Sequence, residues 1–438
     1  MMRLSPTRAS YLIVVIAAFL LSQPVHGQDL LIKAKRVITM NGEVLEPGAV
    51  VISGGKIKAV GQSLDAGSTN TIEVNTLMPG LVNAYDQTGI SGQETERTRE
   101  VTPRLATADI INMQDREFFE QLSNGITTVN VCPGTDNVIS GLSCAVKTAG
   151  TVPIKSKKAS AGLDWHGKPI GPDSKLDWWG APIVRDAANS GPTKTRVNRI
   201  ISANTGLVIA ACSDPASRNF SRSRPDSIYV RQPTNRMGVV WILRSTFHRA
   251  KTASDDNPND ELLRKALDGE QPIFAVSRTH YDITALLNVG EELGFKPVIV
   301  GGEESWKILD TLKDTKTRVV LGSIRPGSER GPERTRVSAN NAGLLHRSGV
   351  EFCFSGNELL EQARFGVRFG LDPNAALEAI TSAPAKILKI DNRVGSIAVG
   401  KDADLVAFSG DPLEFTSSVD WVMVNGQAAF RAKTKTKL

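Results

Sequence analysis

The chain has 438 residues, of which 40% are hydrophobic and 22% charged, and its formal net charge is +6. This size and composition suit a globular protein with one large core or two moderate cores, and they exclude a fibrous repeat and a disordered chain. Basic residues are interspersed with acidic ones and lack an aromatic stacking pattern, so we expect no nucleic-acid partner.

The N-terminus is typical of a secretory signal peptide over residues 1–27. Arg3 and Arg8 precede an apolar run from Tyr11 to Leu21, and short residues precede Gln28. That run is much shorter than the roughly 20 apolar residues that a membrane-spanning helix needs. We therefore expect a periplasmic or secreted protein with no membrane span after cleavage.

The rest of the chain predicts an α/β protein with β structure at both ends. Residues 28–77 alternate β-branched runs with turn signals, which predicts the first part of a β-sandwich. Residues 78–389 alternate strand-like and helical stretches, which favours a parallel sheet and most simply a (β/α)8 TIM-like barrel. Residues 390–438 return to a strand pattern, so we expect one composite β-sandwich built from both chain termini.

Two features leave alternatives open. Residues 155–236 are rich in Gly, Pro, Ser, Asp and Arg, which predicts a loop-rich insertion that is either functional or a cover for an apolar surface. The cysteines lack CxxC spacing and indicate neither a zinc knuckle nor a disulfide framework. A single Cys132–Cys144 bridge is an alternative in an oxidising compartment.

Two segments resemble the amidohydrolase superfamily. Residues 78–85 (MPGLVNAY) resemble the entry into its first barrel strand, and residues 394–406 (VGSIAVGKDADLV) resemble the return to its β-sandwich. Residues 125–129 (GITTV) and 133–141 (PGTDNVISG) are similar to the imidazolonepropionase-like branch. The resemblance implies a substrate site at the C-terminal mouth of a barrel, hydrolysis of non-peptide C–N bonds in cyclic amides or similar compounds, and zinc or another divalent metal.

The metal-ligand positions implied by this resemblance no longer hold ligands. A bound metal would lower the pKa of a water to near 7, and an acidic side chain would shuttle its proton. The paired histidines of the first strand fall on Tyr85 and Gln87. The histidines of strands five and six fall on Val276 and Gly301, and only the amide of Asn357 stands near the position of the aspartate. We therefore expect no metal cofactor.

No other pattern replaces the missing ligands. The histidines beyond the signal peptide have no second histidine two to five residues away, which disfavours a histidine-based zinc site. They are His166, His248, His280 and His346. His280 follows a strand-like run beside Arg278, at the expected barrel mouth. A phosphate-binding P-loop and a Gly-x-Ser-x-Gly elbow are both absent from the sequence.

Polar residues at the ends of predicted strands define a candidate pocket, because a barrel brings such residues to one face. The pocket candidates are Tyr85, Asp86, Gln87, Arg278, His280, Glu303 and Asn357. Asp86 with Glu303 suits either metal-free acid–base chemistry or a calcium or magnesium site. Arg278 suits an anionic small-molecule ligand that is bound without turnover.

The sequence thus leaves open whether the protein is an enzyme. One hypothesis is an exported, metal-free pseudoenzyme with reduced or lost catalysis. It would be a ligand-binding or partner subunit, acting as a homo-oligomer or beside an active relative. The alternative is an active C–N hydrolase with an altered metal or carboxylate site. The alternative requires three or more ligand atoms at the strand ends, within about 2.0 to 2.6 Å of a common point.

Overall fold

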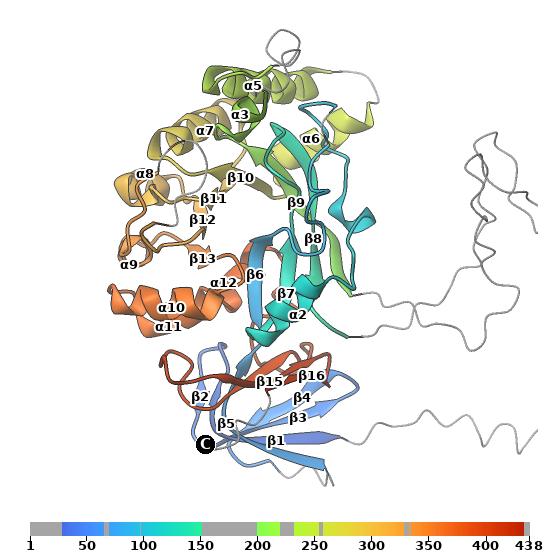
Figure 1. The fold of residues 1–438 in the computed structure, drawn as a ribbon, viewed down its shortest axis with the longest axis vertical. Coiled ribbons are helices and arrows are strands. Elements are labelled where there is room, and N and C mark those ends of the chain that lie inside the picture. The colour runs from blue at the N-terminus through green and yellow to red at the C-terminus, as the bar shows by residue number, and fades with distance from the viewer. Residues whose placement is uncertain are drawn as a thin grey trace, which may run out of the picture. The chain divides into compact units, whose positions relative to one another are not determined.

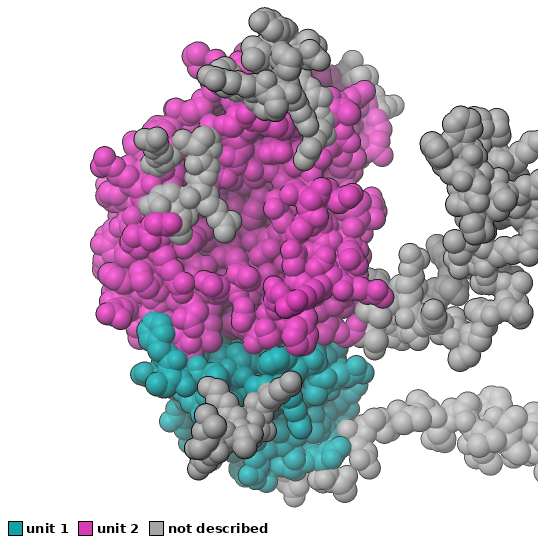
Figure 2. Space-filling view, viewed as in Figure 1, with its two compact units in different colours: residues 1–80, 391–438 teal, residues 81–390 magenta. Residues whose placement is uncertain are grey.

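A computed structural model describes residues 29–64, 70–96, 98–150, 199–219, 232–253, 257–327, 333 and 335–432. The expected signal peptide lies outside these ranges, and so do residues 155–198 and 220–231 of the expected insertion. The chain divides into two compact units, Met1–Gly80 with Asp391–Leu438 and Leu81–Ile390 (Figure 2). In the described part of the chain, every helix is too short or too polar to cross a membrane.

The first unit is one eight-stranded sheet that both chain termini build. Its strands are β1 (Leu30–Ile38), β2 (Val44–Leu45), β3 (Gly48–Ser53), β4 (Lys56–Gly61), β5 (Asn70–Pro79), β14 (Leu405–Phe408), β15 (Val419–Val424) and β16 (Gln427–Arg431). The strand order is β16-β15-β14-β5-β1-β3-β4, with β2 paired to β1. Alternate residues such as Ile32, Leu77 and Leu405 bury one apolar face. The predicted joint sheet of the two termini is confirmed.

The second unit is built on another eight-stranded sheet, which the Leu81–Ile390 segment forms alone. Its strands are β6 (Leu81–Asp86), β7 (Ile126–Val131), β8 (Ile139–Lys147), β9 (Ile200–Ala210), β10 (Ile273–Ser277), β11 (Pro297–Gly301), β12 (Arg318–Leu321) and β13 (Phe352–Phe354). The order is β13-β12-β11-β10-β9-β8-β7-β6. Strands β9 to β13 are neighbours and run parallel, so their carboxyl ends lie at the same end of the sheet.

One strand departs from the predicted all-parallel sheet. β8 runs antiparallel to both β7 and β9. The chain between β7 and β8 comprises only residues 132–138, and a parallel pair needs a crossover of about a dozen residues or more. The short connection therefore makes β7 and β8 a hairpin.

The helices follow the strands along the chain, and Figure 1 shows several of them beside β10 to β13. They are α2 (Arg116–Ser123), α3 (Asp214–Asn219), α5 (Arg236–Thr252), α6 (Pro258–Leu267), α7 (His280–Leu293), α8 (Leu309–Asp314), α9 (Asn341–Arg347), α10 (Leu359–Arg368), α11 (Pro373–Glu378) and α12 (Ser382–Ile387), with the 3-10 turns η1 (Thr107–Asp109) and η2 (Ser305–Lys307). Side-chain caps fix several helix starts. Thr279, for example, accepts a hydrogen bond from the backbone of Asp282 and so begins α7 directly after β10.

The two edge strands of this sheet, β6 and β13, are linked through the segment that precedes α12. The backbone N–H of Val82 donates to Ile380, and that of Phe354 donates to Ala379, at 2.9 and 3.0 Å. Among the described residues the ladder itself runs from β6 to β13 without joining its ends. The observed architecture is therefore a mixed α/β fold whose sheet edges meet through residues 379 and 380.

Two further expectations concern this unit. The described part of the segment 155–236, which was predicted to be loop-rich, includes the eleven-residue strand β9 in the middle of the sheet, at the strand-like run 206–212. The Cys132–Cys144 bridge is not formed, because both cysteines are free and buried. Cys144 lies directly across from Val131 in the hairpin, so these two side chains share a face. Cys132 is the residue after Val131, and neighbouring residues point to opposite faces, so Cys132 and Cys144 point away from each other.

Candidate functional site

Polar side chains gather where strands of the second unit end. Cys212 and Asp214 follow β9, and Arg278 is the first residue after β10. Tyr85 lies near the end of β6. Since β9 and β10 are adjacent and parallel, the sheet brings Asp214 and Arg278 side by side.

Arg278 and Asp214 form a charged pair at the centre of this group. Nη1 and Nη2 of Arg278 donate to the two carboxylate oxygens of Asp214 at 2.9 and 2.6 Å, and the hydroxyl of Thr135 donates to the same carboxylate at 2.6 Å. Burial would raise the pKa of Asp214, but the hydrogen bonds from Arg278 outweigh it and hold the pKa below its ordinary value. Burial would likewise lower the pKa of Arg278, but the bond to Asp214 raises it. Both groups therefore stay charged.

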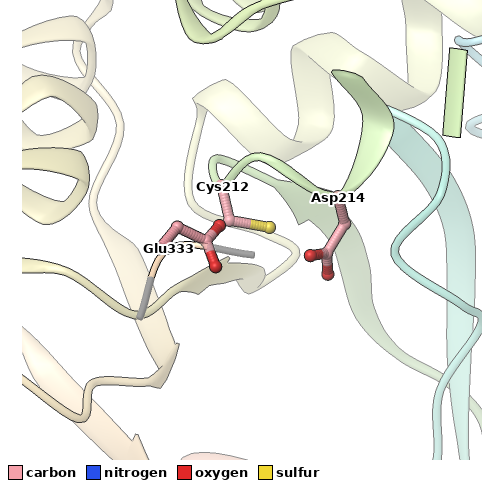
Figure 3. A group of neighbouring side chains, drawn as sticks. All are labelled: Cys212, Asp214 and Glu333. Atoms are coloured by element: carbon pink, nitrogen blue, oxygen red, sulfur yellow. The ribbon is translucent and has the colours of Figure 1, made fainter. Parts of the chain in front are cut away.

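Cys212 and Glu333 complete the cluster. The Cys212 sulfur and one carboxylate oxygen from each of Asp214 and Glu333 lie within 4.8 Å of one another (Figure 3). One oxygen of Glu333 accepts hydrogen bonds from the Ser213 N–H at 2.8 Å and from the Ser213 hydroxyl. The other oxygen lies 3.6 Å from Nη1 of Arg278. Burial raises the pKa of the Cys212 thiol well above its ordinary value, so the thiol keeps its proton.

The Tyr85 hydroxyl lies within electrostatic reach of this cluster. Burial raises its pKa well above the ordinary value, while the charge of Arg278 lowers it and that of Asp214 raises it. Its oxygen is buried and has no hydrogen-bond partner among the described residues. A neutral, buried hydroxyl thus stands unsatisfied at the end of β6.

A second arrangement forms where α7 begins. Nδ1 of His280 lies 2.7 Å from Oε2 of Glu304, which also accepts from Lys307 at 2.9 Å. The backbone N–H of Arg336 donates to the other oxygen of Glu304 at 2.9 Å. Burial would raise the pKa of Glu304, but these hydrogen bonds, that of His280 first, lower it to about 2. The His280 side chain remains 41% exposed, so its second nitrogen is open to a ligand or to water.

Asp86, expected in the pocket, instead builds the turn after β6. One carboxylate oxygen accepts from the backbone N–H groups of Gln87 and Thr88 and from the Thr88 hydroxyl, at 2.8, 3.1 and 2.9 Å. The other accepts from Asn83 and Gln121, at 2.8 and 3.1 Å. A carboxylate with this many donors is poorly suited to proton transfer.

The remaining candidates play different parts. Glu303 is buried, and a Cβ on Gly301 would stand 2.9 Å from its Oε2 and 3.3 Å from Cγ of Arg278, so this carboxylate lies near the Arg278 side chain. Gln87 is partly exposed, whereas Asn357 is exposed and its carbonyl accepts from Asn124 at 2.9 Å. Of the predicted residues, Arg278 belongs to the cluster, and Tyr85 and Glu303 lie near it.

Sequence reasoning missed Cys212, Asp214 and Glu333. The strand-like run at 206–212 was visible, and the Cys-Ser-Asp sequence that begins at its last residue was the available signal. Glu333 gave no signal, because it reaches Ser213 across 120 residues of chain.

The residues at the positions that the sequence resemblance implies for metal ligands are poor donors for a divalent ion. Val276 is a buried apolar side chain within β10, and Gly301 has none. Tyr85 presents a protonated hydroxyl, and Gln87 an amide. The positive charge at this end of the sheet is instead the guanidinium of Arg278.

Comparisons with known proteins find similarity to amidohydrolases in part of the sequence and in the fold. Residues 257–429 match the amidohydrolase family. The fold is similar to that of an amidohydrolase from Thermotoga maritima MSB8, with a TM-score of 0.74, 23% identity, and coverage of 92% of this chain and 100% of that one. The family match includes the segment 394–406, and the likeness to the solved structure extends to the fold of 92% of the chain.

More distant matches share the fold. A Xaa-Pro dipeptidase with bound methionine in its active site has a TM-score of 0.53 at 17% identity, covering 92% of this chain and 100% of that one. Molinate hydrolase has a TM-score of 0.52 at 16% identity, covering 93% and 95%. Amidohydrolase tasK of Hapsidospora irregularis is 40% identical over 72 residues, which are 16% of this chain. The match spans only 7% of that relative's length.

Proposed function

We propose that this protein, which has the amidohydrolase fold, is an exported ligand-binding protein that does not carry out metal-assisted hydrolysis of C–N bonds. It would be a divergent member of the imidazolonepropionase-like branch, with a closed barrel and a small-molecule site at the mouth. The observation that supports this most directly is the position of Arg278. Its guanidinium pairs with Asp214 and faces Glu333, so a permanent positive charge already occupies the group of acidic side chains.

The cluster is poorly suited to proton transfer. A metal would supply an activated water to this fold, but the family's ligand positions do not fit one. Asp214 accepts from Arg278 and Thr135, and its lowered pKa makes it a weak base. Arg278, with its raised pKa, does not give up a proton near neutral pH. Since the Cys212 thiol stays protonated, it is a weak nucleophile.

The same residues suit ligand binding. The unsatisfied hydroxyl of Tyr85 offers a hydrogen bond, and the half-exposed His280 offers a second polar contact. A bound small molecule would satisfy the Tyr85 hydroxyl, which is costly to leave buried without a partner. Partners of the protein would be such a ligand, further copies of the chain or an active relative.

The His280–Glu304 pair favours a second candidate function, a metal-free C–N hydrolase with a carboxylate-assisted histidine. Glu304, ionised because its pKa is about 2, would hold the Nδ1 proton of His280 and stabilise the charged imidazole. The second ring nitrogen would then take a proton from an attacking water.

Hydrolysis assays on the purified protein separate these functions. Cyclic amides, N-acyl amino acids and dipeptides are incubated with the protein alone, with Zn²⁺ and with Mn²⁺, and each compound is also screened for a thermal shift. The proposal expects no hydrolysis under any condition and a saturable shift with some compounds. Metal-dependent turnover contradicts it, and turnover without metal that His280→Ala abolishes establishes the second candidate.

Export is tested separately by fractionation of producing cells. We expect the protein outside the cytoplasm, with an N-terminal sequence that begins at Gln28. A cytoplasmic protein that retains Met1 would contradict export without affecting the conclusions about the site.

A further inference from the structure

We propose that Cys212, Asp214 and Glu333 form a latent site for a thiophilic divalent cation such as Zn²⁺ or Cd²⁺, which the guanidinium of Arg278 keeps closed. The inference rests on the proposed function, in which Arg278 is the resident cation. The site differs from the family's metal positions at Tyr85, Gln87, Val276 and Gly301, since it uses none of them.

The spacing of the three donors supports a metal site. The Cys212 sulfur and one oxygen each of Asp214 and Glu333 lie within 4.8 Å of one another. In a tetrahedral zinc site, ligand atoms about 2.0 to 2.3 Å from the ion stand roughly 3.3 to 3.8 Å apart, so side-chain movements of about 1 Å would bring the three donors to a common ion. In Figure 3 the sulfur of Cys212 lies between the carboxylates of Glu333 and Asp214. Thiolate and carboxylate donors together suit zinc and cadmium better than calcium or magnesium.

The charges in the cluster point the same way. Two carboxylates, of Asp214 and Glu333, face the single guanidinium of Arg278. The Glu333 side chain is only 2% exposed, and its Oε2 finds no hydrogen-bond partner in the described part of the chain. Burying a carboxylate with one oxygen unsatisfied is costly, and a cation at this point would remove the cost.

The Tyr85 hydroxyl is an independent sign that the cluster takes a ligand. It belongs to another strand, β6, and its buried oxygen lies within electrostatic reach of Arg278, Cys212 and Asp214. Its oxygen has no hydrogen-bond partner among the described residues. A metal-bound water, or a second ligand of the ion, would give this hydroxyl an acceptor.

Arg278 competes with the ion by charge. Both of its terminal nitrogens hold Asp214, so a divalent ion has to displace them and to lie near a like charge. The ion must also replace the proton of the Cys212 thiol, which passes to solvent as the metal–sulfur bond forms. The site therefore opens when Arg278 is replaced by a neutral side chain.

The test compares Arg278→Gln with the unaltered protein during titration with Co²⁺ and Cd²⁺. Glutamine keeps a hydrogen-bond donor for Asp214 but removes the charge. We expect the variant to bind one ion per chain at least about tenfold more tightly than the unaltered protein. A sulfur-to-metal charge-transfer absorption should accompany binding, with release of one proton per ion.

Matched variants test whether the gain in metal affinity comes from removing the Arg278 charge and whether Cys212 is a ligand. Arg278→Lys removes the two-pronged contact but keeps the charge, so we expect no gain in affinity. Adding Cys212→Ser to Arg278→Gln should abolish the charge-transfer absorption. Arg249→Gln breaks the pair between Arg249 and the buried Asp260, 3.1 Å apart, and should leave metal affinity unchanged.

Each outcome decides the matter. Circular dichroism establishes that the variants are folded, and Arg278→His, which adds a neutral ligand, replaces Arg278→Gln if the latter does not fold. A folded neutral variant with no gain in affinity overturns the latent site but leaves the metal-free function standing. Tight binding by the unaltered protein, with a Cys212-dependent absorption, overturns both the closing role of Arg278 and the proposed function.

Discussion

Arg278 and Asp214 meet through two parallel hydrogen bonds of 2.9 and 2.6 Å, and their side chains are only 11% and 14% exposed. Replacing Asp214 removes both of these bonds from a buried guanidinium, which in the described part of the chain keeps only Glu333 at 3.6 Å as an opposite charge. We therefore expect Asp214→Asn to lower the free energy of unfolding by about 3 kcal/mol. Urea denaturation followed by circular dichroism measures the change.

An exposed pair of the same unit provides the control. Arg244 and Glu292 lie 2.8 Å apart, with side chains 44% and 48% exposed. Because solvent screens its charges, such a pair contributes only about 0 to 1 kcal/mol to the free energy of unfolding. Glu292→Gln should therefore change stability little. Equal losses for Asp214→Asn and Glu292→Gln would refute the importance of burial at Asp214.

The stability of the fold should fall at acid pH through Glu304. The ordinary pKa of this side chain is 4.5, and its hydrogen bonds lower it to about 2 in the folded protein. A lowered folded pKa stabilises the protein above the unfolded value, and that contribution is lost as the pH falls from about 4.5 toward 2. Thermal melts across this interval measure the loss.

Glu304→Gln isolates that contribution. The variant has no carboxyl group to titrate at this position, so its melting temperature should depend less on pH below 4.5 than that of the unaltered protein. Asp214 also has a lowered pKa, but it is present in both proteins and cancels in the comparison. Identical pH profiles would contradict the role assigned to Glu304.

The elements that sequence reasoning predicted well are those with local signals. The joint sheet of the termini follows from alternating apolar residues, as in β1, and from turn residues such as Gly54 and Gly55, both of which adopt positive φ. The motifs at 78–85 and 394–406 likewise lie within single short segments. Features of this kind need no knowledge of what the chain contacts elsewhere.

The parts that were missed depend on distant contacts. The short connection after β7 makes β8 run antiparallel to it. An alternating pattern of apolar residues indicates a strand but does not indicate its direction. The cluster needs Glu333, a residue with no strand or motif around it, to reach Ser213. Arg278 was recognised as a site residue, but its partner Asp214 was not, so an anion site was expected where an internal pair exists.

Gly301 should resist substitution, which would explain why a histidine is not readily regained there. Its φ is +95°, and an added Cβ would lie 2.9 Å from Oε2 of Glu303. We expect Gly301→Ala to cost about 2 kcal/mol of unfolding free energy. Gly294, with φ of +90° and open space around its Cβ position, is the control. Gly294→Ala should cost less than Gly301→Ala; equal losses would mean that contact with Glu303 is unimportant.

Asp86 should matter for stability and not for ligand binding. Its carboxylate accepts hydrogen bonds from backbone and side-chain groups around the turn after β6. Asp86→Ala leaves those donors without an acceptor and should lower the free energy of unfolding by about 2 kcal/mol. Gln87→Ala, at the next residue, should change it by less than about 0.5 kcal/mol. A ligand affinity that falls in Asp86→Ala while stability is unchanged would restore Asp86 to the pocket.

Thiol accessibility tests both the burial of the cluster and the absence of the bridge between Cys132 and Cys144. The chain has 4 cysteines, and all are free and buried. Burial raises the pKa of Cys144 to about 12 and also raises that of Cys212, so both thiols are protonated at neutral pH. Because the thiolate is the reactive form, Ellman's reagent should react slowly with the native protein and with all 4 thiols after denaturation.

The Cys212→Ser variant completes this measurement. After denaturation, the variant should show one reactive thiol fewer than the unaltered protein. In the native state, its remaining buried thiols should react as slowly as they do in the unaltered protein. Fast reaction of one native thiol that this variant abolishes would mean that Cys212 is an exposed thiolate, contrary to its burial. If the unaltered protein, denatured without reduction, shows two thiols fewer than its 4 cysteines, a disulfide forms. The hairpin register that separates Cys132 from Cys144 would then be wrong.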